Sequence, residues 1–364
     1  MRIMKIVMTL SNPFKPDPRV YKEARSLVKH GYDVTIIAWD REGKYPEEEL
    51  YEGIKIKRIK LKSRYGDFLD FVLKLPLFYL KALLLLLKEE FDVIHTHDFD
   101  TALLGFVMKI LKGKRWIYDV HDLYESFIEM RPISRIVSYI DSLMIQKSDD
   151  VIVVNEKVVK ILRERGRKGE IAVVMNTIPP IKLPIKKNRD FTIFYAGVLS
   201  RGRFIIEMID IAEELGVVIK IAGSGELRKE VKKRCHGKCK FYGYIPHDKS
   251  LRGLSKAHVT FAVYDPSIKN NQLASPNKLF EAMALETVPL VTMGSVMEEI
   301  VKMGKCGLSV KYSRDDVKEK LLYLINNPKY LRKMGRTGKK VFLAKYIWEK
   351  MEKKLLKIYH GEQG

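Results

Sequence analysis

Three glycine-bearing junctions in the second half of the chain could hold a phosphorylated ligand. Each follows a short apolar run and precedes a helical pattern: Tyr195-Ala196-Gly197, Ile221-Ala222-Gly223 and Phe241-Tyr242-Gly243. Glycine at such a turn lets the backbone approach a ligand closely. The first junction leads into Arg201 and Arg203, whose guanidinium groups suit a diphosphate. The third carries Tyr242 and Tyr244, and their rings suit a nucleotide base.

The segment Ser275-Pro276-Asn277-Lys278-Leu279-Phe280-Glu281-Ala282-Met283-Ala284 is typical of a helix start. Ser275 or Asn277 can cap the helix, and Pro276 suits its first turn. Glu281 comes four residues after Asn277 and shares its helix face, so its carboxylate can accept hydrogen bonds from ribose hydroxyls. The helix start and Lys278 then face phosphate. The plainer alternative is an amphipathic helix with a surface glutamate, but the three junctions ahead of it favour a nucleotide site.

Histidines mark strand ends in the first half. His121 is a candidate catalytic residue, together with Arg203 and Glu281 of the second half. Its flanking Asp119 and Asp122 could orient the ring or raise its pKa. A structural histidine is the alternative reading. Of His95 and His97, which both lie at one strand end, we expect one to face a ligand cleft and the other to pack.

Two segments resemble metal sites without fitting one. Asp98-Phe99-Asp100 mimics a carboxylate pair but is better interpreted as a helix cap. Cys235-His236-Gly237-Lys238-Cys239 has the wrong spacing for the usual zinc pairs. We therefore predict no metal and no cofactor.

The elements that position these residues alternate between strand and helix, which predicts an α/β fold of two doubly wound parallel sheets. The expected strands are 3–10, 33–39, 54–61, 92–96, 115–120, 150–154, 171–175, 191–197, 217–222, 239–242, 258–263, 288–292 and 307–311. Residues 177–189 hold three prolines and predict a linker. We expect domains at 1–180 and 190–343, with a helix over 344–360 returning to the first domain. Ligands bind at the carboxyl ends of such strands, so a cleft between the domains is the predicted site.

Composition and charge narrow the class of protein. The 364 residues fit two domains, and three cysteines argue against a disulfide framework and for a reducing compartment. Residues 1–150 carry 25 Lys/Arg against 23 Asp/Glu, whereas residues 151–364 carry 42 against 22. The basic half suits either an anionic partner or a solvated lysine-rich surface. We predict a cytoplasmic protein and leave peripheral contact with the inner face of an anionic membrane open.

Two segments of the first half bear on that membrane contact. The segment 68–87 is interrupted by Asp70, Lys74, Pro76 and Lys81, so it predicts no spanning helix. For its leucines we favour packing in the core over membrane contact. The strand 54–62 alternates apolar and basic residues, and a solvated outer strand is favoured over an anionic contact.

These motifs together resemble the retaining glycosyltransferases of family 4, which have the two-domain GT-B fold. The resemblance covers nearly the whole chain, and residues 275–284 followed by Pro289-Leu290-Val291 are its most specific part. The first half is similar to the family at Asp17-Pro18-Arg19-Val20, at Gly31-Tyr32-Asp33-Val34, at Asp92-Val93-Ile94-His95-Thr96-His97 and at Tyr118-Asp119-Val120-His121-Asp122. Trp348 lies where such chains return to their first domain.

The resemblance implies a role for each candidate residue. Glu281 would bind the donor ribose, Arg203 the diphosphate, and His121 would lie near the reacting sugar. The residues assigned to acceptor binding are Asp17, Arg19, His97, Asp98 and His121. Two positions depart from the family pattern: Val198 stands where a second arginine is usual, with Arg201 as its substitute, and Leu273 stands where a second glutamate is usual. Backbone amides of residues 274–277 would then grip the donor sugar.

The implied reaction moves a hexose from a UDP- or GDP-sugar to a hydroxyl of a glycan, a lipid-linked or a small acceptor, with retention. The matching motifs offer no carboxylate nucleophile, so the leaving phosphate would take the acceptor's proton during front-side attack. Two alternatives stay open: a nucleotide-sugar 2-epimerase of the same fold, and a non-catalytic basic protein that binds nucleic acid or membrane. The ordered glycine junctions argue against the second, and we expect no nucleic-acid partner.

Overall fold

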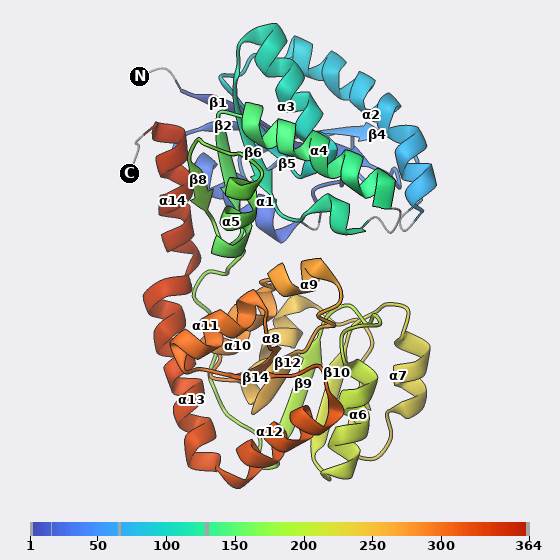
Figure 1. The fold of residues 1–364 in the computed structure, drawn as a ribbon, viewed down its shortest axis with the longest axis vertical. Helices are drawn as coiled ribbons and strands as arrows, with labels where there is room; N and C mark the ends of the chain where they lie inside the picture. Colours follow the sequence, from blue (N-terminus) through green and yellow to red (C-terminus); the bar gives the residue numbers. More distant parts are fainter. Residues whose placement is uncertain (1–2, 16, 65–66, 128–130, 362–364) are drawn as a thin grey trace. The chain divides into compact units, whose positions relative to one another are not determined.

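The protein folds as two compact units, which Figure 1 shows in a computed structural model describing residues 3–15, 17–64, 67–127 and 131–361. The first unit comprises Met1–Val174 with Glu352–Gly364, and the second comprises Met175–Met351. The chain thus enters the second unit at Met175. The segment 177–189, predicted as a linker, packs within that unit: Ile178 is buried and pairs with Ile347.

An eight-stranded sheet forms the centre of the first unit, in the order β3-β4-β2-β1-β5-β6-β7-β8. Its strands are β1 (Lys5–Leu10), β2 (Asp33–Asp40), β3 (Glu48–Tyr51), β4 (Ile54–Lys60), β5 (Val93–His97), β6 (Arg115–Val120), β7 (Asp150–Val153) and β8 (Ile171–Val173). Its helices are α1 (Pro18–Lys29), α2 (Phe68–Lys88), α3 (Phe99–Lys112), α4 (Arg131–Lys147) and α5 (Glu156–Glu164), with a 3-10 turn at Tyr124–Phe127. The central strands are almost wholly buried, as expected of a parallel sheet covered on both faces.

Strand β3 was not predicted, and it corrects the interpretation of its neighbour. It pairs antiparallel with β4, so β4 is not the outer strand that its alternating lysines suggested. Arg58 of β4 is buried and donates to the carbonyl oxygens of Pro13 and Pro46. The short acidic strand pairs with the basic one, with Glu48 opposite Lys57. Opposite charges on adjacent strands account for this pairing.

The second unit has a six-stranded parallel sheet in the order β11-β10-β9-β12-β13-β14. Its strands are β9 (Thr192–Ala196), β10 (Val218–Ala222), β11 (Cys239–Phe241), β12 (Val259–Ala262), β13 (Val288–Thr292) and β14 (Leu308–Val310). Its helices are α6 (Ile205–Glu214), α7 (Arg228–Arg234), α8 (His247–Lys256), α9 (Lys269–Leu273), α10 (Asn277–Ala284), α11 (Val296–Gly304), α12 (Arg314–Asn326) and α13 (Pro328–Val341). A π-helical turn, Phe342–Tyr346, leads to α14 (Trp348–His360), whose last residues belong to the first unit.

Both sheets reverse their strand order at one place, between β1 and β5 in the first unit and between β9 and β12 in the second. Such a reversal opens a crevice at the carboxyl ends of the two strands, which is where doubly wound folds bind ligands. The two sheets and their helices confirm the predicted fold class.

The structure also bears on the predictions about cysteine pairing and about membrane-spanning helices. A disulfide joins Cys235 and Cys239, a pairing that the sequence did not predict, and Cys306 is a buried free thiol. Among the described residues, every helix is too short or too polar to cross a bilayer.

Candidate active site

The reversal point of the second unit gathers most of the residues predicted to bind a nucleotide. The loop after β9 begins at Gly197 and runs to Arg203, while β12 ends beside it and leads to Tyr264. The amide of Asp265 donates to the carbonyl of Gly202 at 2.8 Å, so the two loops are tied together. Gly202 and Asp265 are more than sixty residues apart in the sequence, and the order of strands in the sheet brings them together.

The glycine junctions pack against one another. The amide of Gly197 donates to Ala222 O at 3.1 Å, and the amide of Gly223 donates to Gly243 O at 2.7 Å. A Cβ atom on Gly223 would lie 1.8 Å from the carbonyl oxygen of Gly197. These glycines therefore allow three neighbouring loops to pack closely together. From the sequence we had predicted only that they make room for a ligand.

Two cations lie close together at this point. The guanidinium of Arg203 lies 4.0 Å from the ring centroid of Tyr264, and Lys278 Nζ lies 3.8 Å from that of Tyr195. Burial, together with the charge of Arg203, lowers the pKa of Lys278 to about 7, although Glu281 acts in the opposite direction. The depressed pKa reflects first the burial of the ammonium group and then the nearby guanidinium, and a bound anion would stabilise the charged form of Lys278.

The start of α10 offers polar atoms to the same crevice. Pro276 occupies the N-cap position, so the prediction that Ser275 or Asn277 caps the helix is wrong. Within the part of the chain that the structure describes, Ser275 Oγ and Asn277 Oδ1 are buried without a hydrogen-bond partner. Buried polar atoms without partners are costly, and a helix start favours negative charge.

Glu281 lies one turn further along α10 and is largely buried. Its Oε1 accepts from Nε2 of the exposed His247 at 2.8 Å, and this bond raises the pKa of the histidine. The second oxygen of the carboxylate remains a good acceptor for a hydroxyl pair.

The other residues predicted to bind nucleotide lie nearer the surface. Tyr242 and Tyr244 are both exposed, as is Val198 at the position of the usual second arginine. Arg201, proposed as its substitute, is exposed, and its amide donates to Glu226. Lys278 is the cation that the structure places beside Arg203. Leu273 ends the short helix α9 ahead of α10.

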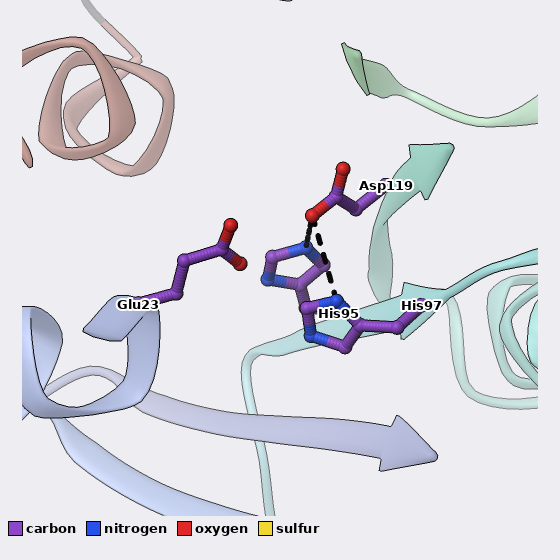
Figure 2. Close-up of side chains that lie close together, drawn as sticks. All are labelled: Glu23, His95, His97 and Asp119. Atoms are coloured by element: carbon purple, nitrogen blue, oxygen red, sulfur yellow. Dashed lines mark ion pairs between the residues drawn. The ribbon is translucent and has the colours of Figure 1, made fainter. Parts of the chain in front are cut away.

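In the first unit several predicted residues form a charge network around the buried Asp119, which Figure 2 shows beside Glu23, His95 and His97. Arg19 Nη2 lies 2.9 Å from both carboxylate oxygens, and His121 Nε2 lies 2.9 Å from Oδ2. Burial alone would raise the pKa of Asp119, but Arg19 and His121 hold it well below its usual range. Arg19 also lies 3.2 Å from Glu23 and donates to Val174 O.

His121 is held from both sides. Its Nδ1 lies 3.2 Å from Asp98 and its Nε2 contacts Asp119. Burial opposes the charged form, but the two carboxylates raise the pKa of His121 well above its usual value, so the ring is a cation at neutral pH. The sequence named Asp122 as a partner. Asp98 takes that place, and it also accepts from the amides of His121 and Asp122 instead of capping α3.

One first-unit prediction is wrong, and the structure also places three of the residues assigned to an acceptor. His95 and His97 are both buried, with ring centroids 4.2 Å apart, because residues two apart on a strand point to the same face. His97 and Arg19, assigned to an acceptor, are enclosed in the Asp119 network. Asp17, also assigned to an acceptor, caps α1 by accepting from Val20 N at 3.0 Å.

Glu23, His95, His97 and Asp119 are also the residues that could hold a metal ion. One ligand atom from each lies within 4.8 Å of the others, and Figure 2 shows the four side chains converging. Arg19 already supplies a positive charge to both carboxylates in this cluster. A divalent cation there would meet a fixed guanidinium, which disfavours its binding.

Sequence reasoning missed His247, Tyr264, Glu23 and Tyr359, whose hydroxyl lies 2.7 Å from His95 Nδ1. For Tyr264 a signal existed, since it follows β12, the strand next to β9 in a doubly wound order. For His247 and Tyr359 the partners lie 34 and 264 residues away, and no local pattern reveals them.

Two protein-family models match this chain, one in its first half and one in its second half. The model of Glycosyltransferase Family 4 matches residues 19–181, and that of Glycosyl transferases group 1 matches residues 181–341. Two glycosyltransferases of Methanocaldococcus jannaschii with uncharacterised activities are similar in sequence. One is 23% identical over 92% of this chain and 91% of its own length, and the other is 26% identical over 75% and 76%.

Solved structures share the whole fold. The sucrose-phosphate synthase of Thermosynechococcus elongatus has a TM-score of 0.81 at 16% identity, over 98% of each chain. Anabaena HepE in complex with UDP has a TM-score of 0.74 at 11% identity, over 98% of this chain and 100% of that one. These neighbours have the GT-B architecture, with coverage that leaves neither unit out.

Proposed function

Because the chain belongs to the family 4-like glycosyltransferases of GT-B fold, we propose that it moves a hexose from a UDP- or GDP-sugar to an acceptor hydroxyl with retention. One observation carries the donor part of this proposal. Arg203 and the buried Lys278 lie where the second sheet reverses its strand order, and burial, with the charge of Arg203 added to it, lowers the pKa of Lys278. An anionic diphosphate is the ligand that relieves this repulsion.

Each part of the donor has a candidate group. Arg203 and Lys278 would hold the diphosphate, together with the free amides at the start of α10. Ser275 Oγ and Asn277 Oδ1, which lack partners among the described residues, would bind sugar hydroxyls. Glu281 would accept from the ribose, while the exposed rings of Tyr242 and Tyr244 would contact the base.

Ligands of structural neighbours support the class of donor and acceptor. Anabaena HepE has been solved with UDP, with UDP and glucose, and with UDP-glucose. The Staphylococcus aureus protein TarM, in a mutant form, has been solved with UDP, α-GlcNAc-glycerol and fondaparinux. By analogy we propose a nucleotide-sugar donor and a glycan, lipid-linked or small-molecule acceptor for this chain.

The reaction exchanges one bond at the anomeric carbon. The bond from C1 to the diphosphate oxygen breaks, and the electron pair leaves with the nucleoside diphosphate. A bond from C1 to the acceptor oxygen forms on the same face, and the acceptor's proton passes to the leaving phosphate oxygen. Arg203 and Lys278 would stabilise the charge that develops on that phosphate.

His121 would act as a positioned cation. Against the effect of burial, Asp98 and Asp119 raise the pKa of His121 and so favour its protonated form, which suits a positioned cation better than a base. Asp98, with a partly exposed carboxylate, and His121 are the first-unit residues that we propose to contact the acceptor or the transferred sugar.

We further propose that transfer needs no metal, because Arg203 and Lys278 supply the charge that a metal would provide and Arg19 fills the only four-residue ligand cluster among the described residues. Treatment with EDTA followed by dialysis should then leave the rate of transfer unchanged. A loss of activity that Mg²⁺, Mn²⁺ or Zn²⁺ restores would refute this part.

The test of function is product formation from a panel of nucleotide sugars with hydroxyl acceptors, followed by NMR assignment of the product anomer. Retention of the donor's configuration supports the proposal, and inversion refutes the mechanism. Incubation with donor alone distinguishes a 2-epimerase from a glycosyltransferase, because an epimerase would consume the nucleotide sugar without an acceptor. A non-catalytic basic protein would yield no product, and neither Arg203→Ala nor Glu281→Gln would change its nucleotide affinity.

A further inference from the structure

Helix α2 carries a stripe of exposed leucines along its whole length. The stripe consists of side chains spaced three or four residues apart, which places them on one face: Leu69, Leu73, Leu77, Leu80, Leu84 and Leu87. Leu73 is 78% exposed and Leu80 is 55% exposed. A helix of 21 residues extends this stripe over about 30 Å.

The opposite face of α2 is the one that packs in the core. Phe78, Ala82 and Leu86 are fully buried, and the ring of Phe78 stacks on Trp39 at 4.8 Å. The prediction that the leucines of this segment belong to the core is therefore wrong for the stripe. A surface helix normally turns a polar face outward, so a helix that is apolar on both faces indicates a partner.

Helix α4 of the same unit also carries exposed apolar side chains. Helix α2 packs beside α3 and α3 beside α4 (Figure 1). On α4, Ile136 is 58% and Tyr139 is 68% exposed, and Ile133 and Ile140 are exposed beside them. We call the α2 stripe and these α4 side chains the apolar face of the first unit.

The charges beside the stripe indicate what covers it. Lys74, Lys81 and Lys88 recur every seven residues along one flank of α2. Lys81 and Lys88 are exposed, whereas Lys74 is half-buried and pairs with Asp70 of the same helix at 2.8 Å. Long lysine side chains can extend from an apolar surface toward phosphate groups. A second copy of the chain would bring lysine rows toward one another without an acidic row to meet them.

We propose that the apolar face docks on an anionic lipid bilayer, with the α2 leucines in the headgroup and acyl boundary and the lysines on lipid phosphates. This is the binding mode of interfacial helices that lie in the membrane plane. None of the donor-site residues takes part, so the inference stands or falls independently of the proposed transfer.

The test is flotation of the full chain with vesicles of phosphatidylcholine alone or mixed with phosphatidylglycerol, without nucleotide or acceptor. We expect binding to the anionic vesicles that weakens with salt. Leu73→Glu should lower the partition coefficient by about tenfold or more, because a charge replaces an exposed leucine that would enter the bilayer boundary. The matched control is Met303→Glu on α11, which changes a side chain of similar exposure, 71%, in the second unit and should leave binding unchanged.

A second variant separates charge from apolar contact. Lys81→Glu combined with Lys88→Glu should remove most of the preference for anionic vesicles, by about tenfold or more. Circular dichroism must show that each variant is folded. The proposal is overturned if the wild type binds neither vesicle, or if Leu73→Glu and Met303→Glu behave alike. It is also overturned if sedimentation reveals a dimer that Leu73→Glu dissociates, since a second copy would then cover the face.

Discussion

At the scale of single residues, the donor site depends on Lys278, whose ammonium lies near Arg203 and over the ring of Tyr195. With a pKa of about 7, this side chain loses its proton as pH rises through neutrality in the unliganded protein. A bound diphosphate favours the charged form, so binding must take up a proton at pH values above that pKa.

We therefore expect nucleotide-sugar affinity to fall about tenfold between pH 6 and pH 8, because less of the free protein carries the charged lysine. A nucleotide sugar is the right probe, since its diphosphate is blocked at both ends and has no ionisation near neutral pH. Calorimetry in buffers of different ionisation enthalpy measures the proton uptake. Lys278→Met should bind more weakly with no such pH dependence. If the affinity of Lys278→Met depended on pH as the wild type's does, the titrating group would be a residue other than Lys278.

Arg19 was selected from the sequence as a site residue, but its ion pairs with buried carboxylates were not predicted. Its guanidinium holds the buried carboxylates of Asp119 and Glu23. Arg19→Ala should lower the free energy of unfolding by about 3–5 kcal/mol, because two buried carboxylates lose their partner. Arg25→Ala, which removes an exposed ion pair with Glu52 from the same helix, should cost about 0–1 kcal/mol.

Denaturant unfolding followed by circular dichroism measures both variants. Equal destabilisation would show that the Asp119 network is not anchored by Arg19.

The sequence could identify Arg203, Lys278 and Glu281, because glycine junctions and a helix start mark their positions locally. It could not identify the tyrosine ring that each of Arg203 and Lys278 contacts, or the hydrogen bond of a histidine to Glu281. Those contacts depend on the order of strands in the sheet, which local residue patterns do not encode.

At the scale of elements, the loops after β9, β10 and β11 form one layer through backbone contacts between glycines. Gly223→Ala would place a Cβ atom against Gly197 O in a backbone conformation with φ of 143°. We expect a loss of about 2–4 kcal/mol in unfolding free energy from clash and strain together.

Gly237→Ala is the matched control. Gly237 also has positive φ, but a Cβ atom there would meet no atom within 4 Å. It should cost about 1–2 kcal/mol from backbone conformation alone. Thermal unfolding that ranks Gly237→Ala as the more harmful change would contradict the close packing of the three loops.

Strands with strong apolar patterns were predicted to within a few residues, since burial on both faces dictates their composition. Strand β3 and helix α9 were missed because each is short, and neither Glu-Glu-Leu-Tyr nor Lys-Asn-Asn-Gln-Leu has a usable period. Pairing with β4 stabilises β3, and that is a tertiary effect.

At the scale of the whole molecule, the chain leaves the first unit after Val174 and returns to it at Glu352. The end of α14 completes the first unit: Tyr359 contacts His95, and Arg115 donates to the carbonyl of Ile358. The C-terminal residues thus contribute to the core that supports the Asp119 network.

Tyr359→Ala should therefore destabilise the first unit by about 3–5 kcal/mol through the cavity and the lost hydrogen bond. Hydrogen exchange should rise in peptides from β5 and β6 and stay unchanged in peptides from β9 and β12. Lys357→Ala, an exposed change on the same helix, should shift stability by less than about 0.5 kcal/mol. Equal loss of protection in both units would contradict the division of the chain.

The most direct test of the central claim is a calorimetric titration of the nucleotide sugar that best stabilises the wild type. Arg203→Ala should weaken its binding by roughly ten- to hundredfold, the value of one charge-assisted hydrogen bond to phosphate. Arg252→Ala, which removes an exposed arginine of α8, should leave binding unchanged. Equal affinities for the wild type and Arg203→Ala would contradict the claim that the reversal point of the second sheet holds the donor diphosphate.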